Sequence, residues 1–92
     1  MSEDACRIDV WLWRARLFKT RSLAARIVED GRVRLVRGGT DARFDKPSRT
    51  VRPGDGVVLA VAGRLIAVKV EALGERRGPP AEARALYSEL PA

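Results

Sequence analysis

The segment Lys19-Thr20-Arg21-Ser22 combines cationic and hydroxyl side chains in the way that phosphate-binding sites do. Thr20 is a suitable N-cap for a helix that begins at Arg21. The N-terminus of a helix presents free backbone N–H groups and roughly half a positive charge to an anion. The neighbouring hydroxyl groups and cations add charge-assisted hydrogen bonds. The segment therefore predicts an anion site, and Arg26 follows one turn later, near the same side of the helix.

Further cations could extend this site. Arg14 and Arg16 flank the apolar stripe of a preceding helix, Arg34 points outward from a predicted strand, and Arg49 follows later in the chain. The alternative interpretation is a solvated basic face in which Thr20 acts only as a helix cap. Spacing alone leaves both interpretations open.

The positive charge of the chain is concentrated in its first half. The 92 residues carry a net charge of +6, with a sequence pI near 10.7. Residues 1–54 contain thirteen Lys and Arg residues against seven Asp and Glu residues, whereas residues 55–92 contain five of each. Fifteen of the eighteen cations are arginine, whose guanidinium group forms bidentate contacts with phosphate. This asymmetry indicates a face that binds a polyanion.

Composition argues against catalysis. The sequence has no histidine, so imidazole chemistry is impossible, and its single Cys6 can form neither an internal disulfide nor a cysteine-rich zinc site. The pair Gly38-Gly39 lacks the signature of a phosphate-binding loop. A single domain of 10.1 kDa leaves no room for a large catalytic cleft. We therefore expect a non-enzymatic protein with no metal, cofactor or small-molecule substrate.

Membrane insertion and secretion are not expected either. The longest apolar run, residues 57–62, is far shorter than a transmembrane helix, and the acidic residues 1–7 do not resemble a signal peptide. A free Cys6 thiol suits a reducing compartment. The sequence predicts a cytoplasmic protein.

Two amphipathic helices are predicted before residue 32. In the first, apolar residues recur at helical spacing at Ile8, Trp11, Leu12 and Ala15. This stripe predicts a helix over residues 10–18 with Asp9 as its N-cap, and it places Trp11 and, less completely, Trp13 in the core. The second helix is predicted over residues 21–30 and is stopped by Gly31. Its inward residues are predicted to be Leu23, Ala24, Ile27 and Val28.

The rest of the chain predicts strands and one short helix. Residues 33–35 alternate like a strand, residues 37–46 suggest a loop or an irregular hairpin, and residues 57–62 and 65–70 suggest a hairpin. A tail helix is predicted from Pro80, with Ala83, Leu86, Tyr87 and Leu90 on its apolar face. These elements define a small α+β domain over residues 5–75, with a helical tail over residues 76–92 that docks on it.

Several motifs resemble the S4-like RNA-binding domain. They occur in the family's order and spacing over roughly fifty residues: Arg7-Ile8-Asp9, Trp11-Leu12, Lys19-Thr20-Arg21-Ser22-Leu23-Ala24, Gly31-Arg32-Val33, Lys46-Pro47-Ser48 and Val51-Arg52-Pro53-Gly54-Asp55. Within that family the chain is most similar to the heat shock protein 15 branch. The motifs of that branch are Trp11-Leu12-Trp13-Arg14-Ala15-Arg16, Phe18-Lys19-Thr20-Arg21 and the tail Glu75-Arg76-Arg77-Gly78-Pro79-Pro80.

The resemblance implies two helices packed on a short antiparallel sheet and binding to structured RNA. Members of the closer branch associate with free 50S ribosomal subunits that carry a nascent chain on tRNA, and help to recycle them in stress. The implied partner is thus rRNA of the large subunit, with tRNA as a further possibility. Carried over by position, the RNA-contacting residues are Arg7, Lys19, Thr20, Arg21, Ser22 and Arg26, followed by Arg32, Lys46, Ser48 and Arg49.

The sequence departs from the family in two places. The family usually has an Asn-Gly turn after the strand that begins at Val33, whereas this chain has Arg37-Gly38-Gly39-Thr40 and extra residues. Longer relatives continue into a basic C-terminal extension, whereas this sequence ends at Ala92. We expect any anchoring to the subunit by such an extension to be missing here or to be met elsewhere.

Two alternatives stay open from the residues alone. A helix-turn-helix DNA reader also has two short helices with a tight turn, although packing would occupy much of its second helix. A generic binder of structured RNA or tRNA would need only the basic face.

Overall fold

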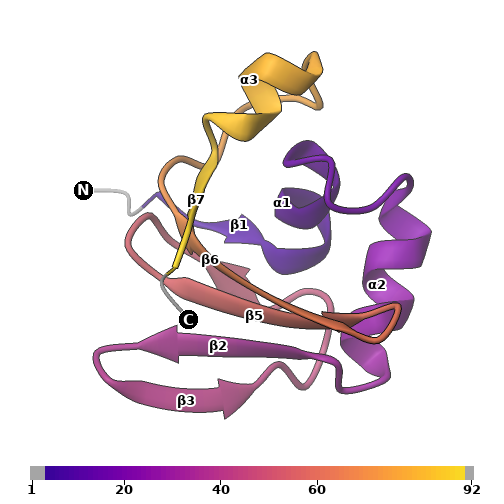
Figure 1. Ribbon diagram of the computed structural model, residues 1–92, viewed down its shortest axis with the longest axis vertical. Coiled ribbons are helices and arrows are strands. Elements are labelled where there is room, and N and C mark those ends of the chain that lie inside the picture. Colours follow the sequence, from indigo (N-terminus) through magenta and orange to yellow (C-terminus); the bar gives the residue numbers. More distant parts are fainter. Residues whose placement is uncertain (1–3, 91–92) are drawn as a thin grey trace.

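The computed structural model describes residues 4–90, which form an antiparallel sheet with two helices packed on one side of it (Figure 1). The helices are α1 (Ile8–Arg14), α2 (Arg21–Glu29) and α3 (Pro80–Arg84). The strands are β1 (Cys6–Arg7), β2 (Val33–Arg37), β3 (Thr40–Arg43), β4 (Thr50–Val51), β5 (Gly56–Val61), β6 (Arg64–Val70) and β7 (Tyr87–Glu89). The main sheet has the order β3-β2-β5-β6-β7, and β1 pairs separately with β4. The predicted α+β class is confirmed.

Helix α1 is shorter than the predicted helix over residues 10–18, and it starts earlier. It ends at Arg14 because Arg16 adopts a left-handed conformation with φ of 60°. The N–H groups of Arg16 and Leu17 donate to the carbonyls of Trp13 and Leu12, which is the Schellman pattern of helix termination. Glycine usually takes this position, so an arginine there is not recognisable as a stop signal.

The predicted N-cap role of Asp9 is wrong. Arg7 occupies the N-cap position without a side-chain cap, and Asp9 lies in the first turn, where it is buried. The loop before β4 satisfies the first helical N–H groups instead, since Ile8 donates to the Arg49 carbonyl at 2.8 Å and Asp9 to the Pro47 carbonyl at 3.4 Å. The Asp9 carboxylate is therefore available for another contact.

Helix α2 follows the prediction closely. The Thr20 hydroxyl accepts a hydrogen bond from the Leu23 N–H at 3.0 Å, so Thr20 is the N-cap, and Gly31 with φ of 77° ends the helix. Ala24 and Val28 form the centre of its buried face. Leu23 was predicted to face inward but is 40% exposed, because it lies at the edge of that face.

The segment predicted as a loop or an irregular hairpin, residues 37–46, contains a regular hairpin. Strand β2 extends to Arg37, and β3 pairs with it from Thr40 to Arg43. Gly38 and Gly39 both have positive φ, as a two-residue hairpin turn of type I′ requires. The glycine pair thus does what the Asn-Gly turn of the S4-like family was expected to do.

The tail is also different from the prediction. Helix α3 covers only Pro80–Arg84, and Tyr87 and Leu90 do not continue it. Instead the chain extends into β7, which pairs with β6, while the Leu86 carbonyl accepts hydrogen bonds from the N–H groups of Glu71 and Ala72. Pairing with the edge of β6 is favoured here over a longer α3, because it satisfies backbone N–H and C=O groups of β6.

The core lies between the helices and the sheet. Its buried members are Ile8, Trp11, Leu12, Ala15, Phe18, Ala24, Val28, Val33, Phe44, Val51, Val57, Leu59, Val68, Val70 and Leu86. Trp13 is only half-buried. Cys6 also joins this cluster as a free thiol, and burial raises the pKa of the Cys6 thiol. Within residues 4–90, none of the helices is both long enough and apolar enough to span a bilayer.

We expect Asp55 to make the fold sensitive to acid. Burial acts to raise the pKa of Asp55. Its carboxylate accepts hydrogen bonds from the Arg37 guanidinium at 2.9 and 2.7 Å and from the Arg52 N–H at 2.8 Å. These contacts outweigh burial, so the pKa of Asp55 lies below its ordinary value. A lowered folded-state pKa means that this stabilisation is complete above the unfolded pKa of about 3.9 and is lost as the pH falls through the folded-state value. Asp55→Asn should cost about 1–2 kcal/mol of unfolding free energy at pH 7, measured by urea denaturation. The difference from the wild type should shrink below about pH 4, and a difference that stays constant into acid would contradict this role.

Candidate nucleic-acid interface

The first turn of α2 and the start of α1 enclose a shallow hollow. It is lined by Asp9, Arg21, Ser22 and Ala25. Helices α1 and α2 pack together here because the chain turns sharply between the Schellman motif of α1 and the Thr20 cap of α2. Residues distant from each other in sequence therefore meet at the N-terminus of α2.

Three cations along α2 are available to a ligand: Lys19 and Arg21 lie at its N-terminal end, and Arg26 lies in its last turn. Lys19, Arg21 and Arg26 are exposed, and within residues 4–90 their side chains form no hydrogen bond or ion pair. The Ser22 hydroxyl is likewise exposed and unpaired within that range. The Thr20 hydroxyl oxygen accepts the helix-cap hydrogen bond from the Leu23 N–H, and its O–H remains able to donate to an anion. The α2 terminus thus combines cations, one free hydroxyl and the positive end of the helix dipole.

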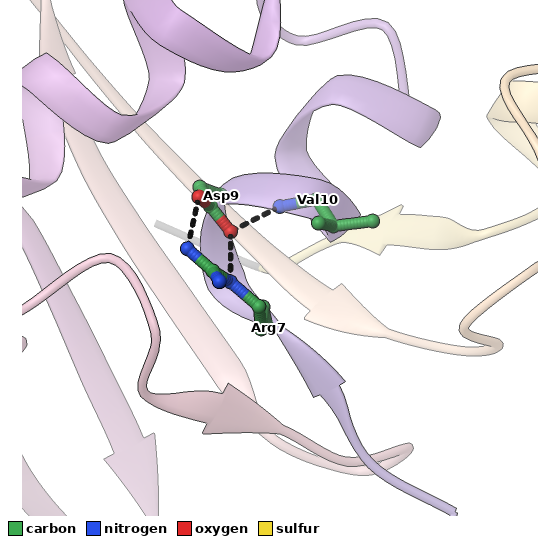
Figure 2. A network of polar contacts seen from close by, with 3 residues as sticks. All are labelled: Arg7, Asp9 and Val10. Carbon is green, nitrogen blue, oxygen red and sulfur yellow. Dashed lines mark hydrogen bonds and ion pairs between the residues drawn. The ribbon is translucent and has the colours of Figure 1, made fainter.

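Arg7 is held in place beside this hollow by Asp9 (Figure 2). Its Nε and Nη2 atoms donate to the two carboxylate oxygens at 3.1 and 2.9 Å, and the Val10 N–H donates to Oδ1 at 2.7 Å. The hydrogen bonds and the charge of Asp9 raise the pKa of Arg7. The Arg7 side chain is 49% exposed, whereas that of Asp9 is 5% exposed. One edge of the guanidinium is therefore fixed, and the rest faces solvent.

The loop before β4 brings a second group of predicted residues to the same region. Arg7 pairs with Thr50 across the β1–β4 ladder, and the Arg49 carbonyl accepts from the Ile8 N–H. Lys46 and Ser48 lie in this loop and are exposed, and Arg49 forms an exposed ion pair with Asp45 at 3.1 Å. The structure therefore places these residues close to Arg7 in space, although they lie in a separate motif much later in the sequence.

Two predicted residues bind the C-terminal segment instead. Arg14 is half-buried and its Nη1 donates to the Gly74 carbonyl at 2.9 Å and the Leu73 carbonyl at 3.4 Å. Arg16 is exposed, but its Nε donates to the Gly78 carbonyl at 2.6 Å. The expectation that both extend the free basic patch does not fit these contacts, because their guanidinium groups hold residues 73–78 against α1.

Arg32 and Arg34 lie at the other end of α2. Arg32 is exposed and lines a hollow with Arg64 and Leu65 at the β5–β6 turn, and Arg34 pairs with Asp41 at 2.6 Å on the β2–β3 hairpin. Arg43, which the sequence analysis did not single out, lies opposite Arg34 on β3 and packs over Gly31. Only the strand register of residues 40–43 could have revealed it. These residues extend the basic surface away from the hollow beside Asp9.

The comparisons with known proteins agree with this geometry. The family model described as S4 domain matches residues 6–35, a segment that runs from β1 through the α2 site into β2. A trimeric structure of Vibrio cholerae heat shock protein 15 superimposes with a TM-score of 0.82 and 36% identity, and the match covers 95% of this chain and 83% of that one. The chain belongs to the heat shock protein 15 family of S4-domain proteins.

Two further relatives define how far the similarity extends. Heat shock protein 15 of Escherichia coli K12 is 37% identical over 83 residues, which are 90% of this chain but 59% of that protein. The RQC P-site tRNA stabilizing factor of Listeria innocua is 32% identical over 84 residues, which are 91% of this chain and 85% of that protein. This member of the family thus spans less than two thirds of the E. coli relative and most of the Listeria one. The resemblance predicted from the motifs is confirmed.

Proposed function

We propose that the chain binds structured RNA of the large ribosomal subunit and associates with free 50S subunits that carry a nascent chain on tRNA, aiding their recycling in stress. It acts as a binding protein in the cytoplasm, without catalysis or a cofactor. The observation that carries this proposal is the cluster of exposed, unpaired cations at the start of α2, beside Arg7 and inside the segment that matches the S4 domain.

The mechanism is electrostatic and depends on shape. The major groove of A-form RNA is too deep and narrow for side chains to read, so a protein recognises the duplex mainly through its phosphates and the 2′-hydroxyls of the minor groove. Arg21, Ser22 and the α2 N-terminus can take one phosphate. Arg7 is paired with Asp9, which lines the same hollow, and Arg26 lies further along α2. With roughly four to six phosphates neutralised, the log–log dependence of affinity on salt should have a slope of about −3 to −5.

The names of the related proteins support a ribosomal target. One relative is named for stabilising P-site tRNA, and others are heat shock proteins. The P site is a tRNA site of the ribosome, so this name supports a ribosomal target that includes tRNA. This chain would therefore recognise rRNA near the tRNA, and tRNA itself is a second possible contact.

Co-sedimentation tests the proposal directly. The protein is mixed with purified 30S, empty 50S, 70S and peptidyl-tRNA-bearing 50S particles at low and at moderate salt, and pelleted through a cushion. We expect retention at moderate salt on the 50S particles that carry peptidyl-tRNA. Equal binding to every particle that disappears as salt rises would reduce the chain to a generic basic RNA binder.

A further inference from the structure

A carboxylate lies in the middle of the surface that is proposed to bind a polyanion. Asp9 lines the hollow together with Arg21 and Ser22, and its side chain is only 5% exposed. Taken as a charge alone, this carboxylate repels a phosphate that approaches the α2 N-terminus. Its position therefore needs a reason other than direct contact with RNA.

The hydrogen bonds of Asp9 provide that reason. Both carboxylate oxygens are engaged by the Nε and Nη2 atoms of Arg7, in the planar fork that fixes a guanidinium in one orientation. A guanidinium has five N–H donors, and this fork uses two of them. The backbone N–H of Val10 fixes the carboxylate in turn, at 2.7 Å from Oδ1. Arg7 thus keeps donors for a ligand while one edge of its guanidinium is locked.

We propose that Asp9 is a positioning residue for RNA binding: it orients Arg7 so that the outer edge of the guanidinium meets a backbone phosphate next to the one held by Arg21 and Ser22. The inference rests on the proposed function and adds a specific role to it. A long side chain that is ordered before binding loses less conformational entropy when the complex forms. The benefit of holding Arg7 outweighs the repulsion from a carboxylate whose charge is already paired.

The sign of one substitution tests this role. Asp9→Asn keeps the size of the side chain and its contact with the Val10 N–H, but it removes the charge and replaces one acceptor by a donor that cannot pair with Arg7. Because the net charge rises by one, general electrostatics predicts tighter RNA binding. A positioning role predicts the opposite, a loss of about three- to tenfold in affinity for purified 50S subunits. The slope of log affinity against log salt should also become shallower by about one.

Asp30→Asn is the matched control. Asp30 is exposed at the C-cap of α2, and its side chain has no partner within residues 4–90. The same change of charge there should leave binding unchanged or slightly tighter, with the salt slope kept. Asp9→Asn that behaves like Asp30→Asn would overturn the proposal.

A double-mutant cycle separates positioning from a loss of folding. Arg7→Lys keeps the positive charge but cannot form the bidentate fork, so it should weaken binding by itself. In the Arg7→Lys background, Asp9→Asn should no longer weaken binding, whereas a purely structural role of Asp9 would weaken it in both backgrounds. If Asp9→Asn does not fold, judged by circular dichroism, Arg7→Lys decides alone: unchanged affinity overturns the proposal. Wild-type protein that binds no ribosomal particle would instead refute the proposed function, and the role of Asp9 with it.

Discussion

Replacing Trp11 with alanine is expected to remove about 3–5 kcal/mol of folding free energy. The Trp11 side chain is fully buried, with 0% exposure, at the centre of the core between α1 and the sheet. Its indole Nε1 also donates to the Ala72 carbonyl at 2.9 Å, so truncation leaves a large cavity and a carbonyl without its partner. A domain of this size has about 5–15 kcal/mol of stability, so the variant should be largely destabilised.

Two control variants separate the contributions. Trp11→Phe keeps most of the apolar volume and removes the indole donor, so it should cost about 1–2 kcal/mol. Trp13→Ala removes a half-buried ring from the same helix and should also cost less than Trp11→Ala. Urea denaturation followed by circular dichroism gives the free energies, and Tm should fall by about 4–8 °C per kcal/mol. Trp11→Ala that melts like the wild type would mean that the placement of α1 in the core is wrong.

Local signals were enough to predict the parts of the fold that depend on neighbouring residues. The Thr20 cap, the Gly31 stop and the apolar face between them lie within one short segment, and α2 forms as predicted. The end of α1 depends on the left-handed Arg16, whose guanidinium binds the Gly78 carbonyl 62 positions away. No residue near Arg16 indicates that contact. The prediction from apolar periodicity therefore extended the first helix too far.

The same distinction applies to the tail and the hairpin. Residues 83–90 have helical spacing of apolar side chains, but residues 87–89 pair with the edge of β6 instead. Pairing with a sheet edge depends on tertiary structure, which local spacing does not reveal. In the β2–β3 hairpin the signal was present, since two consecutive glycines permit a type I′ turn. The prediction for residues 37–46 nevertheless stayed between a loop and an irregular hairpin, because β3 is exposed along its whole length and shows no alternation of apolar residues.

The candidate site was predictable to the extent that it is local. The cations and hydroxyls of residues 19–22 lie where the helix cap placed them. The position of Arg7 beside them depends on its bidentate hydrogen bonds to Asp9. The Arg14 side chain instead donates to the carbonyls of residues 73 and 74, which are distant in sequence. The sequence identified the candidate RNA-binding cations. Only the structure separated the cations that face solvent from those that bind other parts of the chain.

The double variant Arg21→Ala/Arg26→Ala is expected to lose about 2–3 kcal/mol of binding free energy for 50S subunits, or roughly 30- to 150-fold in affinity. Both side chains are exposed and form no bond within residues 4–90, so thermal unfolding should be nearly unchanged. Losing two phosphate contacts should make the log–log salt slope shallower by about two. Binding measured at several salt concentrations gives both quantities.

A variant with the same loss of charge elsewhere decides whether this effect is local. Arg64 and Arg84 are also exposed and unpaired within the described part of the chain, but they lie at the β5–β6 turn and at the end of α3. Arg64→Ala/Arg84→Ala should therefore weaken binding by less than about threefold, through the reduced net charge alone.

An equal loss in both double variants would mean that the RNA responds to total charge rather than to the α2 terminus. A larger loss in the second variant would place the interface on the β5–β6 side, where Arg32 and Arg64 share a hollow. A loss confined to the first variant requires phosphates along α2, because the two variants remove the same charge and differ only in where they remove it.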